Sequence, residues 1–152
     1  MTHRGMLDHD AIAELIPHRG AMCLLARLER WDAERIVCIA TNQRDPQHPL
    51  RTRSGLMAPC AIEYAAQAMA LHGALLAQAA GASASPGFLA SARGVQLHVL
   101  RLDELQGELR IEATRQAGDA NQILYTFAVS HGELPIVDGR AAVVLNTPIA
   151  SS

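Results

Sequence analysis

The stretch PCAIEYAAQAMALHGALLAQAA, residues 59–80, decides the fold because it consists almost entirely of Ala, Leu, Met, Ile and Tyr. Pro59 suits the first position of a helix. At about 100° per residue, Glu63 and Gln67 lie within roughly 40° of each other, and most of the remaining surface is apolar. A helix of this kind is normally buried, and its alanines let a sheet approach closely. We therefore expect one long central helix that packs against a sheet.

The sequence around this helix predicts one short helix and six strands. Asp8 is placed to cap a helix that ends before Pro17. Apolar runs joined by polar turns predict strands at 22–31 and 35–40, and 81–87 is expected to be a terminator and loop. In the second half, apolar and polar residues alternate at 95–99, 109–114, 123–129 and 140–145.

Six strands with one very apolar helix predict an α+β architecture, in which a curled antiparallel sheet wraps around the helix. The pattern contains no repeat and no domain boundary, so we expect a single domain over residues 1–152. The outer face and the edge strands of such a sheet remain uncovered. A dimer is therefore expected.

Composition excludes several classes of function. The chain of 152 residues has a net charge of −2, and all 13 of its cationic Lys and Arg positions are Arg. A lysine Schiff base is thus impossible, and nucleic acid is a poor partner. Three scattered cysteines argue against disulfides or a zinc site, so no metal is expected. Without a signal peptide, and with polar residues inside the long helix, we expect a cytoplasmic protein that has no membrane span.

Glu63 is the most informative polar residue of the predicted central helix. Its apolar neighbours indicate burial, and a buried carboxylate needs a partner and has a pKa raised toward the acid–base range. The alternative is an acid in the first turn that stabilises the helix dipole. Gln67, one turn later on the same face, is suited to hold Glu63 or a bound carbonyl, or to lie where helix and sheet meet.

Two histidines are candidates for a general base at neutral pH. His18 lies between the short helix and the first strand, and His48 lies in the polar loop before the central helix. The alternative for each is a surface or capping role. His72, on the opposite side of the helix from Glu63, is expected to hydrogen-bond within the sheet or at an interface.

Arg51 and Arg53 flank the loop before the central helix. They are suited to contact a phosphate or an acidic partner, and a solvated loop is the alternative. The sequence contains no Gly-rich phosphate loop and no nucleophile elbow.

Two motifs resemble 3-hydroxyacyl-acyl-carrier-protein dehydratases of the hotdog fold. The segment IPHRGAMCLL, residues 16–25, resembles the Leu-Pro-His-Arg motif that opens these enzymes, and AIEYAAQA, residues 61–68, resembles the start of their central helix. The resemblance covers nearly the whole chain and is strongest to the divergent branch found with aryl polyene and xanthomonadin-type pigment synthesis. It implies that Glu63 is the catalytic acid and that Gln67 is the glutamine that follows this acid in the family's motif.

The sequence departs from the better-known dehydratases before the helix. Their Gly-His-Phe-Pro-Gly is absent, and His48 lies one residue further from Glu63 than the histidine of that motif. Either His48 is the base after a loop adjustment, or His18 is the only motif histidine near the site. The backbone N–H of Ala58 stands where the family's glycine donates to the thioester carbonyl, whereas Pro59 has no N–H.

The resemblance implies dehydration of a 3-hydroxyacyl thioester on acyl carrier protein to the trans-2-enoyl thioester, without a cofactor. The enzyme would be a homodimer, a heterodimer with a related hotdog subunit, or a higher oligomer, with the acyl chain in an apolar tunnel beside the helix. Two alternatives stay open. One is a hotdog acyl thioesterase, and the other is a non-catalytic acyl-binding subunit of a dehydratase complex.

Overall fold

The computed structural model describes residues 2–4, 7–82 and 87–145. One antiparallel sheet has the strand order β1-β2-β3-β5-β6-β7-β4. In chain order the elements are β1 (His3–Arg4), α1 (His9–Leu15), a 3₁₀ turn (Gly20–Met22), β2 (Arg27–Trp31), β3 (Arg35–Ala40), a second 3₁₀ turn (Ala58–Cys60), α2 (Ala61–Ala79), β4 (Gly87–Leu97), β5 (Leu109–Gly118), β6 (Gln122–His131) and β7 (Leu134–Leu145).

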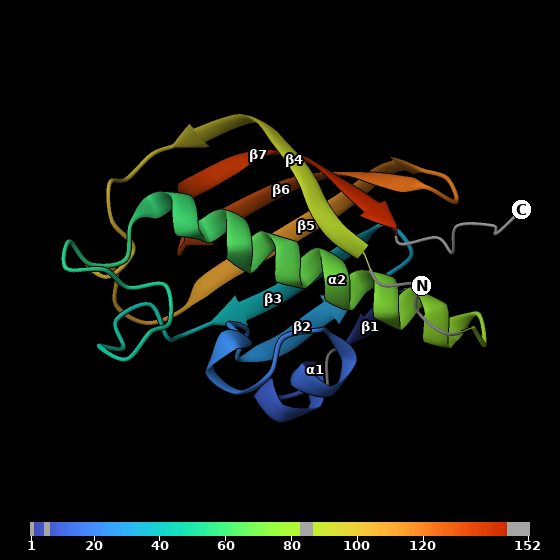
Figure 1. Cartoon of the computed structure of the whole chain (residues 1–152), viewed down its shortest axis with the longest axis horizontal. Helices are drawn as coiled ribbons and strands as arrows, with labels where there is room; N and C mark the ends of the chain where they lie inside the picture. Colours follow the sequence, from blue (N-terminus) through green and yellow to red (C-terminus); the bar gives the residue numbers. More distant parts are fainter. Residues whose placement is uncertain (1, 5–6, 83–86, 146–152) are drawn as a thin grey trace, which may run out of the picture.

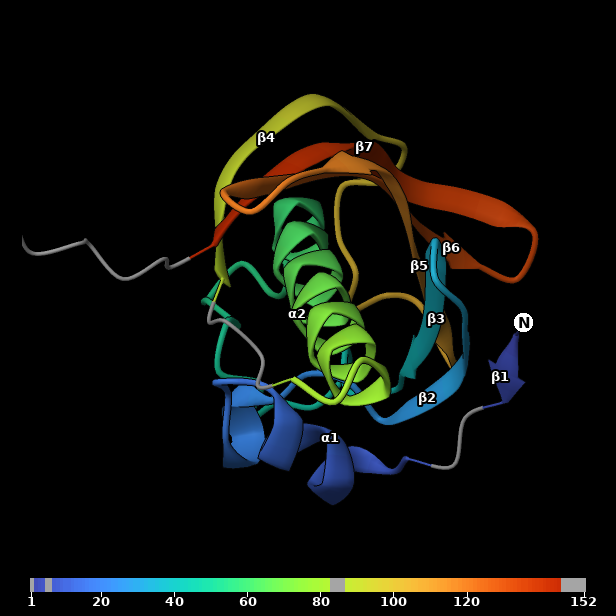
Figure 2. The ribbon, with the colours of Figure 1, turned by 90° about the vertical axis from the view of Figure 1, so that its right-hand side faces the viewer.

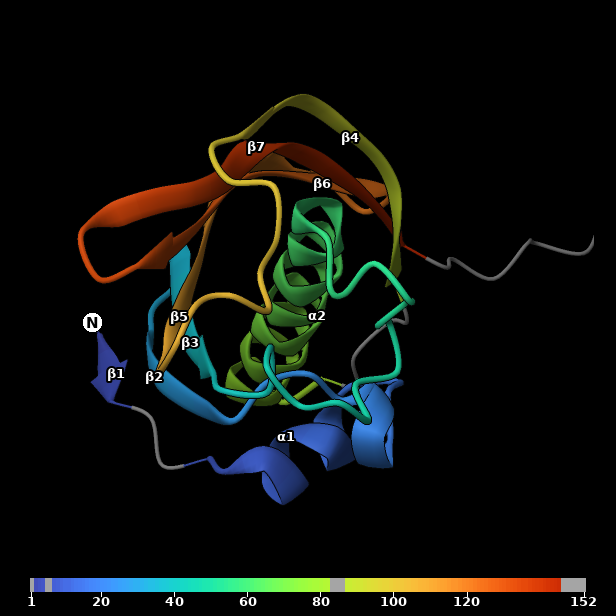
Figure 3. The same ribbon diagram turned by 90° about the vertical axis from the view of Figure 1, so that its left-hand side faces the viewer.

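The sheet curls around α2, which crosses its concave face (Figure 1). Seen nearly along α2, strands β4 and β7 arch over the helix, β5, β3 and β2 pass beside it, and α1 lies below (Figures 2 and 3). Register shifts at Leu89/Ser91 and Arg115/Ala117 interrupt the ladders. Such bulges increase local bending and twist, which helps a sheet to wrap around a helix. The predicted fold, a curled antiparallel sheet around one long helix, is confirmed.

The central helix begins where the sequence predicts. Pro59 lies in the 3₁₀ turn that leads into α2, and the helix then continues to Ala79. At the other end Gly81 has a φ of +69°, and its N–H bonds the Gln78 carbonyl oxygen at 3.0 Å. A left-handed residue of this kind terminates helices, and glycine adopts it without steric cost. The loop predicted for 81–87 falls partly on residues 83–86, outside the described residues.

The other predicted elements need small corrections. Asp8 caps α1 as expected, because its Oδ1 accepts from the Ala11 N–H at 3.0 Å. The short strand β1 was not predicted. Strand boundaries also differ from the sequence expectations: β2 begins at Arg27, β4 spans Gly87–Leu97, β5 continues to Gly118, β6 spans Gln122–His131 and β7 already begins at Leu134.

The late start of β2 has a physical cause in the central helix. The backbone N–H of Leu24 and the carbonyl of Met22 bond the side chain of Gln67 instead of a neighbouring strand. The first contact with β3 comes at Ala26, whose N–H donates to the Ile39 carbonyl at 2.8 Å.

Among the described helices, none combines the length and the apolar character that crossing a membrane requires.

Candidate active site

Glu63 and His18 meet at the start of α2. Glu63 lies in the first turn of the helix, and His18 lies in the segment between α1 and the 3₁₀ turn. The His18 Nε2 atom is 3.2 Å from Glu63 Oε1. Of the two candidate histidines, the structure therefore brings His18 to the carboxylate.

The expected burial of Glu63 is corrected by the structure, since its side chain is 38% exposed in this chain. The N-terminal turn of α2 borders a shallow depression instead of the core, and Leu24, Leu50 and Cys60 contribute to its walls. The partner expected for the carboxylate is nevertheless present. An imidazole and a carboxyl group share a site that a substrate can reach.

Gln67 holds this arrangement together from a fully buried position. Its Oε1 accepts from the Leu24 N–H at 2.7 Å, and its Nε2 donates to the Met22 carbonyl at 2.9 Å. The same Nε2 atom is 3.3 Å from Glu63 Oε1. Gln67 therefore contacts the Glu63 side chain, one of the roles suggested by the sequence, and it also joins α2 to the segment after His18.

The two ring nitrogens of His18 differ in their surroundings. Nε2 faces Glu63, whereas Nδ1 is buried and has no hydrogen-bond partner among the described residues. Because Nδ1 is shielded from solvent, Nε2 is the nitrogen that is available for proton exchange with the carboxyl group or with a ligand.

His48 lies in a different and fully bonded arrangement. The Leu50 N–H donates to its Nδ1 at 3.1 Å, so Nε2 carries the proton and donates to the Tyr64 hydroxyl at 2.8 Å. The Tyr64 hydroxyl in turn donates to Asn42 Oδ1 at 2.6 Å. Burial lowers the pKa of His48 and raises that of Tyr64. This geometry does not support His48 as a base, because accepting a proton requires breaking the bond from Leu50.

Two predicted binding roles change in the structure. The Ala58 N–H, expected to be free for a thioester carbonyl, donates to the Leu100 carbonyl at 3.0 Å, and Ala58 is fully buried. In this chain the Ala58 N–H is therefore already bonded, because residues 100–102 pair with residues 56–58, which lead into α2. Arg51 lies 3.6 Å from Asp103 of its own chain. Arg53 is exposed and has no ion-pair partner among the described residues.

His72 has a structural role, as expected. It is fully buried, its Nε2 donates to the Asp32 carbonyl at 2.7 Å, and its Nδ1 is 2.8 Å from the Tyr125 hydroxyl. Because a carbonyl only accepts, Nδ1 is the acceptor of the neutral ring. Burial lowers the pKa of His72.

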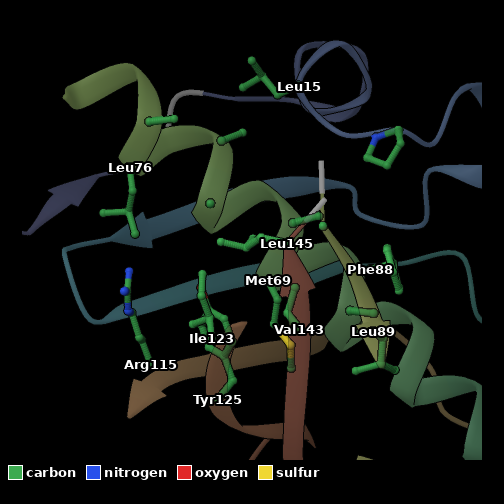
Figure 4. Close-up of a pocket in the computed structure, with 17 residues that line it drawn as sticks. Leu15, Met69, Leu76, Phe88, Leu89, Arg115, Ile123, Tyr125, Val143 and Leu145 are labelled. Carbon is green, nitrogen blue, oxygen red and sulfur yellow. The ribbon is translucent and has the colours of Figure 1, made fainter. Parts of the chain in front are cut away.

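A cavity of about 410 Å³ lies beside α2, along the part of the helix from Ala66 to Ala77, which begins one turn after Glu63 (Figure 4). The small residues Ala66, Ala70 and Gly73 form its helix side, and a Cβ atom built on Gly73 would meet no atom within 4 Å. Strands β4, β6 and β7 supply the apolar opposite walls. The resemblance to the dehydratases implied an apolar tunnel beside the helix, but no residue of its walls was predicted from the sequence. One of them, Arg115, is charged, and alternation along 109–115 places it on the inner face.

The described residues contain no group of three or more His, Cys, Asp or Glu side chains that could hold a metal ion. The arrangement is therefore built from one imidazole, one carboxyl group and an apolar cavity.

Comparison with known proteins places this architecture among hotdog folds. The ApeI:P dehydratase heterocomplex from Xenorhabdus doucetiae matches with a TM-score of 0.80 and 24% identity over 90% of this chain and 91% of that chain. An HP0420 homologue from Helicobacter felis matches with a TM-score of 0.63 and 13% identity over 93% and 89% of the two chains. A Staphylococcus aureus thioesterase variant matches with a TM-score of 0.58 and 13% identity over 77% and 89%.

The assignment to a family rests on the sequence, not on the similarity of the folds. The family model of ApeP dehydratase, called ApeP-like, matches residues 10–150. The chain therefore belongs to the ApeP-like dehydratase family, as its two motifs indicated. No match was found among curated proteins.

Proposed function

We propose that this protein dehydrates a 3-hydroxyacyl thioester, carried on acyl carrier protein, to the trans-2-enoyl thioester during the synthesis of a polyene. The observation that carries the proposal is the contact of 3.2 Å between His18 Nε2 and Glu63 Oε1, next to an apolar cavity along the same helix. Membership of the ApeP-like dehydratase family supports the same reaction.

Elimination of water requires a base at the α-carbon and an acid at the C3 hydroxyl. In the proposed mechanism Nε2 of His18 acts as the base and takes the α-proton, and the carboxyl group of Glu63 acts as the acid and gives a proton to the departing hydroxyl. The C3–O bond breaks, the α,β double bond forms, and water leaves. The proton on His18 then returns to Glu63 across the short distance between the two side chains, which restores the starting state.

The cavity beside α2 is suited to the acyl chain. Its lining continues from Ala66, one turn after Glu63, to Ala77 near the end of the helix. The eleven rises of about 1.5 Å between these two residues correspond to about 16 Å, which is long enough for an extended acyl chain. The open space over Gly73 keeps this path clear.

A second candidate is a chain that works only within a complex with a related hotdog subunit. The specific observation is that the Ala58 N–H is already bonded to Leu100, so the expected donor for the thioester oxygen is occupied. Strand β4 is moreover a long edge strand with exposed apolar side chains, Phe88 at 59% and Leu97 at 49%. The similar ApeI:P structure is a heterocomplex. A partner that joins at β4 would cover this edge and could supply the missing donor.

The test is to incubate the chain, alone and with a related hotdog subunit, with a 3-hydroxyacyl thioester of acyl carrier protein and to identify products by mass spectrometry. We expect the enoyl thioester, and we expect Glu63→Gln to lower kcat/KM about 10²–10⁴-fold. The exposed Glu133→Gln is the matched control and should keep full activity.

Other results would contradict the proposal in distinct ways. Full activity of Glu63→Gln would remove the acid from the mechanism. Release of free thiol would identify a thioesterase. A chain that is inactive even with its Glu63 and His18 intact, but that raises the activity of a partner whose own site does the chemistry, would be a non-catalytic subunit.

A further inference from the structure

One charged side chain faces the concave side of the sheet at the far end of the cavity. Along β5 the inward residues Leu109, Ile111 and Ala113 are fully buried and apolar. The next inward position is Arg115, paired in register with the inward Tyr125 of β6. Figure 4 shows the Arg115 side chain extending from the sheet toward the part of α2 that contains Leu76. A cation thus continues a row of core positions.

The guanidinium of Arg115 lacks the carboxylate partner that three other arginines of the sheet have, a lack it shares with Arg30, Arg93 and Arg140 among the described residues. Arg27, Arg35 and Arg110 each lie within 4 Å of a glutamate. Arg115 has no carboxylate within that distance among the described residues, although its backbone is held by a bond from its N–H to the Glu34 carbonyl. Its side chain is only partly exposed. A partly buried guanidinium needs an oxygen acceptor, because a cation in an apolar environment is costly when it is unpaired.

The remaining polar group of the cavity is already engaged. Among the described residues that line this cavity, only Arg115 and Tyr125 carry a side-chain nitrogen or oxygen atom. The Tyr125 hydroxyl donates its hydrogen to His72 Nδ1. Arg115 is consequently the donor left for a ligand that reaches the end of the cavity.

We propose that Arg115 binds the distal end of the acyl chain, and that this end carries an oxygen acceptor, either a carboxylate or a hydroxyl group. This inference rests on the proposed function and narrows its substrate class from any acyl thioester to one with an oxygen-bearing tail. The apolar walls contact the middle of the acyl chain. The guanidinium donates hydrogen bonds to the oxygen of the tail, and these replace the hydrogen bonds to water that the tail loses on entering the cavity.

The test uses binding as well as turnover. Dissociation constants are measured for dodecanoyl-pantetheine and for its counterparts with a terminal carboxylate or a terminal hydroxyl. In parallel, kcat/KM is measured for the corresponding 3-hydroxydodecanoyl thioesters. A charge-assisted hydrogen bond predicts that the wild-type chain prefers an oxygen-bearing tail about 10–100-fold over the methyl tail. The carboxylate and hydroxyl arms show which oxygen is preferred.

Arg115→Leu should abolish this preference and raise the affinity for the methyl tail, whereas Arg115→Lys should keep preference for the carboxylate. Arg140→Leu is the matched control, because Arg140 is exposed on the same sheet and should leave the preference unchanged. Equal binding of methyl and oxygen-bearing tails by the wild-type chain would overturn the inference while leaving dehydration intact. Selective binding without turnover of any thioester would instead sustain the inference and contradict the proposed reaction.

Discussion

Two loops each bring a histidine to the first turns of α2, and the two imidazole rings differ in their exposure and in their hydrogen bonds. His18 is partly exposed, contacts the Glu63 carboxylate and has a buried Nδ1 without a partner among the described residues. His48 is buried, and both of its nitrogens take part in hydrogen bonds, from Leu50 and to Tyr64. A histidine whose nitrogens are both satisfied in its neutral form gains little from taking up a proton. Saturation of hydrogen bonds therefore separates the structural histidine from the one available for chemistry.

The difference arises within one turn of helix. Glu63 and Tyr64 are neighbours in sequence, so their side chains leave α2 about 100° apart. One direction leads to the open depression with His18, and the other leads into the closed contact with His48. The same helical turn thus carries the proposed acid and one member of a structural network.

The largest expected effect separates the two histidines by activity. His18→Asn should lower kcat/KM for 3-hydroxyacyl thioester dehydration about 10²–10⁴-fold, because it removes the proposed base but keeps a polar side chain of similar size. His98→Asn is the control, because His98 also contacts a carboxylate, that of Asp138, and it should leave kcat/KM unchanged. If His48→Asn eliminates turnover in folded protein while His18→Asn does not, the roles of the two loops are reversed.

The support of the His18 loop can be removed while His18 and Glu63 both remain, although the contact of Gln67 with Glu63 is lost with it. Gln67→Leu leaves the buried Leu24 N–H and the Met22 carbonyl without partners, so unfolding in urea should show a loss of about 3 kcal/mol. Gln78→Leu, at an exposed position of the same helix, should stay within about 0.5 kcal/mol of the wild-type chain. Equal stability of the two variants would mean that the loop does not depend on Gln67.

The His48 network should contribute stability and leave turnover unaffected. Tyr64→Phe removes the hydroxyl that joins His48 to Asn42, and we expect a loss of about 1–2 kcal/mol in the free energy of unfolding. The kcat/KM of the folded variant should equal that of the wild-type chain. A fall in activity comparable to that of His18→Asn would show that this network takes part in the reaction.

The pH dependence of stability is the smallest expected effect. Burial lowers the pKa of His48 and of His72, so the unfolded chain binds protons at these sites more readily than the folded chain. The free energy of unfolding should therefore fall as the pH drops below about 6.5, by no more than about 1.4 kcal/mol per pH unit for each residue. Urea unfolding at pH 7.5 and 5.5 measures this slope. His48→Gln should make it shallower, and an unchanged slope would contradict the assignment.

Much of the architecture was predictable from local patterns. The apolar run at 59–80 and the alternation of 109–114 and 123–129 depend on period alone, and burial of one face enforces that period. The strand predicted at 22–31 was too long because nothing in its own residues shows that Gln67, more than forty positions away, bonds its backbone. Of the candidate site, Glu63 and Gln67 were predictable in the same way, since they stand out as polar residues on one face of an apolar helix, whereas the exposure of Glu63 was not.

The sequence by itself determined the helix, the curled sheet and the candidate carboxylate, because these follow from spacing between near neighbours. Only the tertiary structure decided that His18 meets Glu63, that Leu100 bonds the Ala58 N–H, and that Arg115 lies beside the cavity. Each of these depends on contacts between distant segments. Hydrogen bonds are made by whichever groups the packed chain brings within about 3 Å, and residue order does not specify that distance.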